Sequence, residues 1–137
     1  MKPASPIRLI LKPSSIDGIG VFALTTIPRG APVPLSHEND SKIITDDEIV
    51  RLPQDYLRFH VPDPEGNWWG PIDYHLMSFG WFLNHSKNPN IDVSANFTAV
   101  RDISFGEELT IDYSFWKYPW VENRGKRFVP PWYNLLD

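Results

Sequence analysis

Three short segments carry glycines or polar side chains that can hold a ligand or take part in a reaction. Residues 18–20, Gly-Ile-Gly, let the backbone turn sharply and approach a ligand closely. Asn84 and His85 follow an apolar segment, and their amide and imidazole groups can each donate and accept hydrogen bonds. Residues 106–113 place a turn before an alternating apolar segment that ends at the hydroxyl of Tyr113. Each segment alone is also typical of an ordinary turn or a packed strand.

The residue types exclude several kinds of site. The chain has no cysteine, which excludes disulfide bonds, a cysteine nucleophile and a thiolate zinc site. His85 has no second histidine at ligand spacing, and His37, His60 and His75 are scattered, so we expect no metal cofactor. Residues 18–20 lack the third glycine of a Rossmann loop and no helical pattern follows them, which disfavours a dinucleotide site.

Short strands joined by turns are expected to position these segments, since 14 prolines spread along the chain disfavour long helices. We expect strands at residues 7–11, 21–24, 97–100 and 109–113, a short edge strand at 33–35 and an irregular loop at 62–71. The capping-box pair Thr45 and Glu48 predicts one helix over residues 46–52, which Pro53 ends. Residues 77–83 fit either one helical turn or a buried strand. The pattern predicts a mainly β fold.

Size and charge restrict the class of protein. With 137 residues, 42% of them hydrophobic and 22% charged, the chain fits one globular domain. Its net charge of −4 disfavours direct nucleic-acid binding and suits a cationic partner such as a lysine-rich peptide. No apolar segment has the length of a signal peptide or a membrane span, so we expect no membrane association. We expect a cytoplasmic location, or a nuclear one if the source is a eukaryote. A homodimer that buries some aromatic side chains stays open.

Taken in order along the chain, the motifs resemble the SET domain family of protein lysine methyltransferases. The resemblance rests on residues 18–23 (GIGVFA), 27–30 (IPRG), 84–90 (NHSKNPN) and 106–113 (GEELTIDY). It implies a SET-domain fold, β-clip-like, with several short curved sheets, few short helices and a pseudoknot. In that pseudoknot the Asn-His-Ser segment passes beneath the Asp-Tyr segment.

The resemblance also implies how the chain is divided. We expect a single domain over residues 1–137, with its core at about residues 7–116. A variable insert covers about residues 37–74, and an aromatic tail covers residues 117–137. These two segments are called the insert and the tail below.

The function that the resemblance implies is transfer of a methyl group from S-adenosylmethionine, the expected cofactor, to a lysine side-chain amine in a protein. Tyr113 is implied as the catalytic residue. Cofactor contacts are implied for Gly18, Ile19, Gly20, Asn84, His85, Tyr113 and Trp116. The channel for the substrate lysine is implied to involve Trp81, Ile111 and Phe115. The alternative is a degenerate SET domain that binds a peptide or a partner without turnover.

The chain departs from the usual pattern of the family at informative positions. Trp81 stands approximately where many members have an arginine, and the zinc-binding cysteines that follow the domain in other members are absent. We therefore expect residues 116–132 to build the lid of the lysine channel. Ile111 stands where many relatives have an aromatic residue that restricts the number of methyl groups. We expect multiple methylation, and Ile111→Tyr should lower the methylation state that mass spectrometry detects.

The insert carries more acidic than basic side chains. Its acidic residues are Glu38, Asp40, Asp46, Asp47, Glu48 and Asp55, against Lys42, Arg51 and Arg58. Such a surface could attract a basic, lysine-containing peptide, although an ordinary solvated face fits equally well. We expect the peptide to bind as an added strand along an exposed sheet edge.

Overall fold

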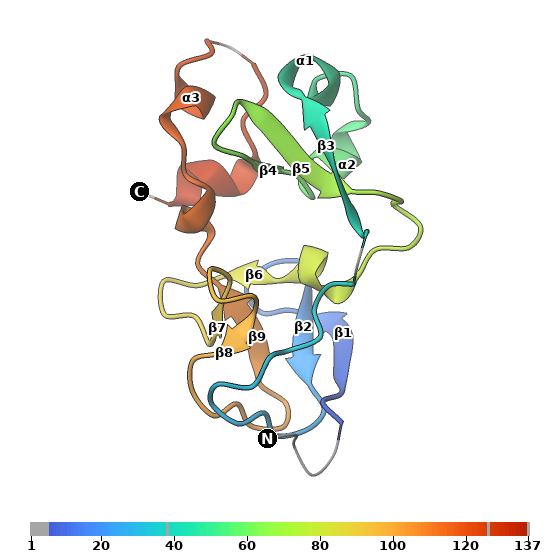
Figure 1. Cartoon of the computed structure of the whole chain (residues 1–137), viewed down its shortest axis with the longest axis vertical. Helices are drawn as coiled ribbons and strands as arrows, with labels where there is room; N and C mark the ends of the chain where they lie inside the picture. The colour runs from blue at the N-terminus through green and yellow to red at the C-terminus, as the bar shows by residue number, and fades with distance from the viewer. Residues whose placement is uncertain (1–5, 38, 126, 137) are drawn as a thin grey trace. The chain divides into compact units, whose positions relative to one another are not determined.

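Short strands dominate the computed structural model, which describes residues 6–37, 39–125 and 127–136 (Figure 1). The chain forms two compact units, each built from two separate stretches of sequence. Unit 1 contains Met1–His37 and Ser78–Asp112, and unit 2 contains Glu38–Met77 and Tyr113–Asp137. Every helix in the described residues has only four or five residues. The predicted mainly β fold with few short helices is therefore confirmed.

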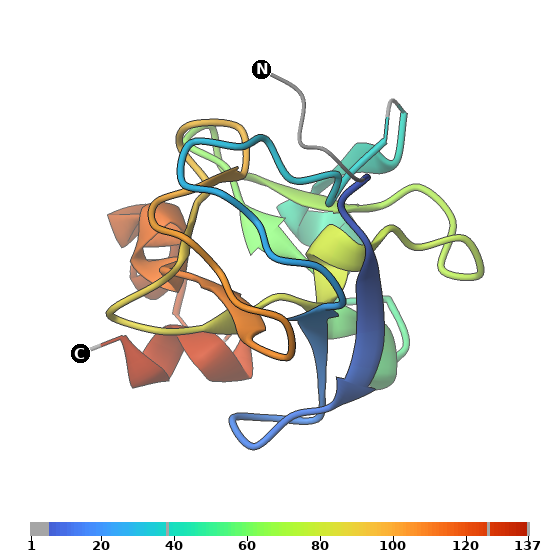
Figure 2. The same cartoon turned by 90° about the horizontal axis from the view of Figure 1, so that it is seen from below.

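Unit 1 is organised around a four-stranded sheet with the order β1-β2-β9-β6. Its strands are β1 (Leu9–Pro13), β2 (Ile19–Ala23), β9 (Glu108–Ile111) and β6 (Asn84–His85). In Figure 2 the strands β1 and β2 of the antiparallel hairpin lie side by side. β6 runs parallel to β9, whereas the other neighbours are antiparallel. A second, two-stranded sheet pairs β7 (Ile91–Asp92) with β8 (Thr98–Ala99).

The core of unit 1 contains buried side chains from β2 and β9. Val21 and Leu109 are directly paired between β2 and β9, and both are fully buried. A bridge between Ile27 and Ile103 buries two further β-branched side chains. Burying a side chain of this size stabilises a fold by about 1.5–3 kcal/mol. Val21 and Ala23 of β2 and Leu109 and Ile111 of β9 are each two residues apart, so each pair points to the same side of its strand and is buried there.

The parallel pair of β6 and β9 brings two motifs together that are far apart in the sequence. Asn84 lies opposite Thr110 and His85 opposite Ile111. Just beyond β6, the backbone N–H of Ser86 donates to the carbonyl oxygen of Ile111 at 2.9 Å. The Asn-His-Ser segment therefore runs beside the strand that leads to the Asp-Tyr segment. The pseudoknot that the resemblance implies stays a prediction.

Unit 2 contains a three-stranded antiparallel sheet with the order β3-β5-β4. Its strands are β3 (Ser41–Thr45), β5 (Asn67–Pro71) and β4 (Val61–Pro62). Two one-turn helices, α1 (Asp46–Ile49) and α2 (Gln54–Leu57), connect β3 to β4. The predicted capping box is confirmed, because the Thr45 hydroxyl accepts from the N–H of Glu48 and the Glu48 carboxylate accepts from the N–H of Thr45.

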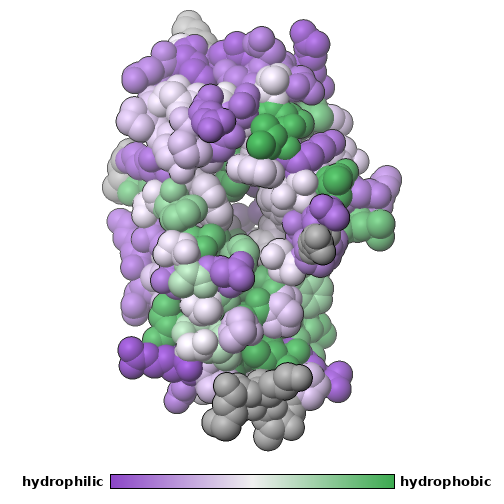
Figure 3. Space-filling view, in the orientation of Figure 1, coloured by the Kyte–Doolittle hydropathy of each residue, from purple (hydrophilic) through white to green (hydrophobic). Residues whose placement is uncertain are grey.

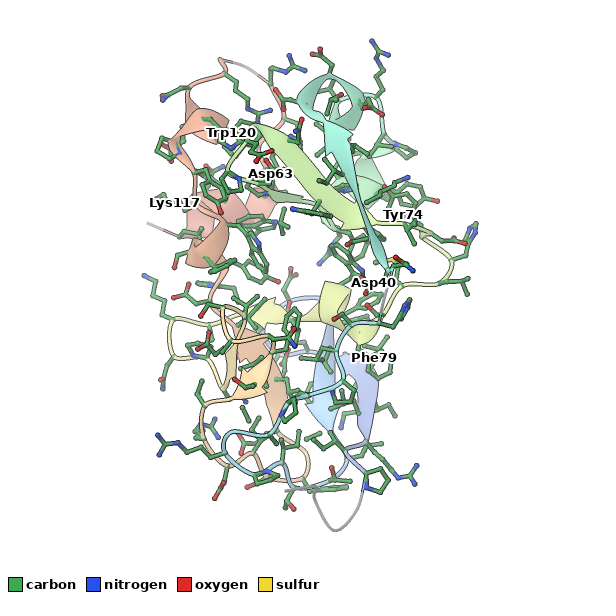
Figure 4. The ribbon with its side chains drawn as sticks, viewed as in Figure 1. Asp40, Asp63, Tyr74, Phe79, Lys117 and Trp120 are labelled. Atoms are coloured by element: carbon green, nitrogen blue, oxygen red, sulfur yellow. The ribbon has the colours of Figure 1, made fainter. Side chains whose placement is uncertain are left out.

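The tail belongs to the same compact unit as the insert. It follows η2 (Tyr113–Trp116), a 3-10 turn, and contains α3 (Pro119–Glu122) and η3 (Pro131–Leu135). Insert and tail together bury one apolar cluster, which consists of Ile44, Ile49, Leu57, Trp68, Val121 and Tyr133. The Trp120 indole N–H donates to the carbonyl oxygen of Asp63 at 2.7 Å, and Figure 4 labels this pair.

Several sequence-based expectations about elements are wrong or need adjustment. The irregular loop expected at residues 62–71 contains β5, and residues 33–35 form no strand although Val33 and Leu35 are buried. The helix expected over residues 46–52 ends as α1 at Ile49. Residues 77–83 contain the helical turn η1 (Phe79–Phe82) rather than a strand.

Candidate functional site

The glycine turn is packed directly against a carboxylate. A Cβ atom at Gly20 would lie 2.2 Å from Oε2 of Glu108 and 3.2 Å from Nδ2 of Asn84, so no larger residue fits there without movement. Gly18 adopts φ = 47°, a left-handed conformation that glycine reaches without steric cost. The predicted Gly-Ile-Gly motif therefore serves both the turn and the close approach of Glu108.

Glu108 joins three separate segments of unit 1. The Ser14 hydroxyl lies 2.7 and 2.9 Å from its two carboxylate oxygens. The Asn84 amide donates to Oε2 of Glu108 at 2.8 Å and to the carbonyl oxygen of Asp17 at 2.9 Å. The loop between β1 and β2, the strand β6 and the strand β9 are thereby held through one carboxylate. The sequence pattern predicts a turn at residues 106–108 and indicates no role for Glu108.

Asn84 therefore bonds the rest of the protein through one end of its side-chain amide, the Nδ2 group. Among the described residues, every side-chain hydrogen bond of Asn84 is made by Nδ2. The amide is 6% exposed and held in one orientation. Its Oδ1 is therefore the atom that a ligand can use, as an acceptor of fixed direction.

His85 follows on the same strand and lies near a carboxylate. Its Nδ1 is 3.8 Å from Oδ1 of Asp112, and the His85 side chain is 20% exposed. This separation allows an attraction between charges when the ring is protonated and is too long for a direct hydrogen bond. The cofactor contact of His85 stays a prediction.

A second asparagine in the same segment, Asn90, supports the strand β9. Asn90 is 2% exposed, and its Nδ2 donates to the carbonyl oxygen of Glu108 at 2.9 Å. Its Oδ1 accepts from the backbone N–H of Thr110 at 2.8 Å. The side-chain amide therefore bonds β9 as the backbone of a neighbouring strand would. The turn before Asn90, which contains Pro89, delivers this amide to the strand.

The remaining predicted residues of unit 1 lie deeper than the turn. Ile111 is 2% exposed, so a tyrosine at this position would have to displace its neighbours. Trp81 lies in η1, and its buried indole N–H has no hydrogen-bond partner among the residues that the structure describes. An unpaired buried donor of this kind is unfavourable unless a ligand or water accepts from it.

Tyr113 begins η2 and lies among aromatic rings of unit 2. Its ring centroid is 5.2 Å from that of Trp132 in an edge-to-face arrangement and 6.0 Å from that of Trp116. Phe115 contacts Trp116 with a centroid distance of 5.7 Å and is 48% exposed. These four residues are called the aromatic cluster below. Trp132 comes from the tail, so the tail contributes a ring directly to the predicted catalytic residue.

The predicted site residues therefore gather in two groups. In unit 1 the glycine turn, Asn84 and His85 are joined by the hydrogen bonds of Glu108 and by the pairing of β6 with β9. In unit 2 Tyr113, Phe115 and Trp116 lie together. Figure 3 shows hydrophilic side chains over the end of unit 2 that carries α1, where Asp47 and Glu48 are exposed.

Metal and membrane features can be assessed only for the part of the chain that the structure describes. There, His, Asp and Glu side chains nowhere gather in a group of three that could hold a metal ion. No helix of these residues reaches the length and hydrophobicity that crossing a membrane requires.

Comparisons with known proteins agree with one another. A sequence model described as the SET domain matches residues 18–114. A Plasmodium falciparum (isolate 3D7) protein named "Putative histone-lysine N-methyltransferase 1" is 26% identical over 155 alignment positions, which cover 94% of this chain and 2% of that protein. The chain thus spans only a small fraction of the length of this relative. A crystal structure of a Plasmodium falciparum "putative histone methyltransferase" superposes with a TM-score of 0.55 and 22% identity, covering 82% of this chain and all of the other.

Proposed function

Because this chain belongs to the SET domain family, we propose that it transfers a methyl group from S-adenosylmethionine to the side-chain amine of a lysine in a protein. The observation that carries the proposal is the joining of the glycine turn to Asn84 through Glu108. This arrangement lies within the residues that match the family. The name of the Plasmodium falciparum relative supports lysine as the acceptor.

The residues of unit 1 fit an adenosyl and amino-acid ligand. Gly18 and Ile19 are exposed where the loop after β1 enters β2, and their backbone offers peptide groups, while Asn84 offers an oriented acceptor. Trp81, which is implied for the lysine channel, has an indole N–H without a hydrogen-bond partner among the described residues, and a bound substrate could accept from it. When bound, the cofactor supplies a methyl group activated by a sulfonium charge.

The chain's own residues must present lysine as a neutral amine. Free lysine has a pKa near 10.4, and its ammonium form has no lone pair with which to attack. Apolar walls such as Phe115 and Trp116 exclude water, lower the pKa of the lysine and let the proton leave to solvent. The Tyr113 hydroxyl then holds the amine in line. Orientation at a reacting distance of about 3–3.5 Å contributes much of the rate.

The partner that we propose is a basic, lysine-containing protein or peptide. The exposed carboxylates of Asp47, Glu48 and Asp55 favour such a partner by charge complementarity. This attraction would weaken at high salt, because exposed charges are screened over about 8 Å at physiological ionic strength.

The experiment that tests the proposed function compares the wild-type chain with Tyr113→Phe. A lysine-rich peptide library and radiolabelled cofactor are incubated with each protein, and transferred methyl groups are counted. We expect the variant to lose most of its turnover, by about 100-fold or more, while its affinity for the cofactor stays within a few-fold. Equal transfer by both proteins would contradict the role of Tyr113. No transfer by the wild type to any lysine would instead favour a SET domain that only binds a peptide.

A further inference from the structure

We propose that Arg124 is a positioning residue that fastens the tail to the insert and thereby holds Trp132 against Tyr113. The fastening itself follows from contacts within unit 2. Its consequence for turnover rests on the proposed function of Tyr113. The three residues Arg124, Asp46 and Trp68 are called the latch below.

Arg124 is enclosed by the insert and the tail. Its guanidinium carbon lies 5.2 Å from the ring centroid of Trp68 in the insert and 5.1 Å from that of Trp120 in the tail. The Arg124 side chain is only 9% exposed and is paired with the carboxylate of Asp46. A planar guanidinium can stack on rings and bond a carboxylate at the same time, which a lysine ammonium cannot do equally well.

The same guanidinium also bonds the backbone of the tail. Its Nε donates to the carbonyl oxygen of Val121 at 3.1 Å, and a terminal nitrogen donates to the carbonyl oxygen of Phe128. These two carbonyl groups lie on either side of the turn that follows α3. Arg124 therefore fixes the shape of the tail as well as its attachment to the insert.

Asp46 is the matching anchor in the insert. Its carboxylate accepts from the Trp68 indole N–H at 2.9 Å, and its backbone carbonyl oxygen accepts from Arg127 at 2.7 Å. The Asp46 side chain is 21% exposed, so solvent screens the pair only partly. Burial lowers the pKa of Arg124, and the neighbouring Asp46 carboxylate opposes this change. Removing Asp46 would leave the mostly buried Arg124 guanidinium without its counter-ion. Removing Arg124 would leave Asp46 with Arg127 alone, whose Nε lies 3.3 Å from Oδ2 of Asp46.

The latch connects to the aromatic cluster through η3. Tyr133, which is 2% exposed, packs in the same apolar cluster as Trp68 and Val121. Its hydroxyl donates to the carbonyl oxygen of Tyr118 at 2.8 Å. The adjacent Trp132 makes the edge-to-face contact with Tyr113.

The direct test is an NMR measurement that does not depend on activity. In the wild type, ring protons of Tyr113 and Trp132 should show a nuclear Overhauser effect. Arg124→Met places an unbranched apolar side chain at this position but lacks the positive charge and the N–H donors. We expect this variant to abolish the nuclear Overhauser effect. The amide signals of Asn84 and Glu108 in unit 1 should stay unchanged. An Arg124→Met spectrum that retains the contact between Tyr113 and Trp132 would overturn the proposal.

Arg101→Met is the matched control, because Arg101 forms an ion pair with Glu107 at 2.9 Å in unit 1 with half of its side chain exposed. This control should leave the contact between Tyr113 and Trp132 intact. If Arg124→Met prevents folding of unit 2, the milder variants Asp46→Asn and Arg124→Lys decide the question with the same signals. Arg124→Lys should retain the contact more fully than Arg124→Met, since it preserves the charge opposite Asp46.

Kinetics then separate the latch from the proposed function. A loosened Trp132 should lower kcat by about tenfold or more, because small misplacements of reacting groups slow catalysis strongly. The dissociation constant for the cofactor should change less than twofold. Loss of the ring contact with unchanged kcat would overturn the role in positioning. A wild type that transfers no methyl group would refute the proposed function alone, while the NMR contact would still decide whether the latch exists.

Discussion

Glu108 accepts hydrogen bonds from segments of unit 1 that are distant in the chain. Replacing it should weaken cofactor binding. Glu108→Ala leaves the Ser14 hydroxyl and the Asn84 amide without this acceptor. Leaving such groups unsatisfied costs about 1–3 kcal/mol. We expect both lower stability in urea and at least about tenfold weaker cofactor affinity in calorimetry, since Asn84 and the glycine turn lose their common support.

Glu107→Gln is the control for that prediction. Glu107 is the preceding residue, and its carboxylate bonds the exposed Arg101 and the N–H of Ser104 rather than the glycine turn. The cofactor affinity of the Glu107→Gln variant should stay near that of the wild type. If Glu107→Gln and Glu108→Ala weakened binding equally, the specific role of Glu108 would be refuted.

The residues of the candidate site differ in how far sequence predicts them. Gly20, Asn84 and Tyr113 are found because their motifs combine unusual residue types in a recognisable order. Glu108 and Asn90 escape notice because their partners are 18 to 94 residues away. A glutamate in a turn and an asparagine after a proline are ordinary in isolation. Only the fold identifies the groups that they bond.

At the level of elements, His60 is packed in the insert between α2 and the sheet of unit 2. It is fully buried, and a Cβ atom at Gly70 of β5 would lie 2.3 Å from its ring. Its Nδ1 is 3.0 Å from the carbonyl oxygen of Tyr56, and its Nε2 is 3.0 Å from the Tyr74 hydroxyl. Because the carbonyl oxygen only accepts, Nδ1 carries the proton of the neutral ring and Nε2 accepts from Tyr74.

Burial lowers the pKa of His60 from 6.5, so unit 2 should lose stability in acid. The unfolded chain binds the proton more readily than the folded one. The contribution of His60 to the free energy of unfolding should therefore be fully present above about pH 6.5. Below that pH it should decrease, by at most about 1.4 kcal/mol per pH unit. Urea unfolding between pH 5 and 8 measures this slope. His60→Gln should reduce it, whereas His75→Gln, at a side chain that is 89% exposed, should not. An unchanged slope in His60→Gln would contradict the assignment.

The strands of the two units were not equally predictable. β9 alternates the buried apolar residues Leu109 and Ile111 with Glu108 and Thr110, so the period of two is visible in its sequence. β5 contains two tryptophans, a glycine and a proline, which mimic an irregular loop. It becomes a strand because Trp68 is fully buried and pairs opposite Ile44 of β3. The burial of a ring by distant partners overrides the local pattern.

At the level of the whole molecule, the compact units do not follow the order of the chain. The tail was expected to act as a lid, but its association with the insert had no local signal. Val121 and Tyr133 lie in a proline- and aromatic-rich segment without a clear period. The contacts that order this segment come from residues more than 50 positions earlier, such as Asp46 and Trp68.

The central claim, a SET domain that binds S-adenosylmethionine for methyl transfer, is tested most directly by calorimetric titration. The wild-type chain is titrated with S-adenosylmethionine and with its demethylated product, and Asn84→Ala serves as the matched variant. Saturable binding of both compounds to the wild type at one site, with clearly weaker binding to Asn84→Ala, is the result that we predict. A folded wild-type chain that binds neither compound would contradict the claim.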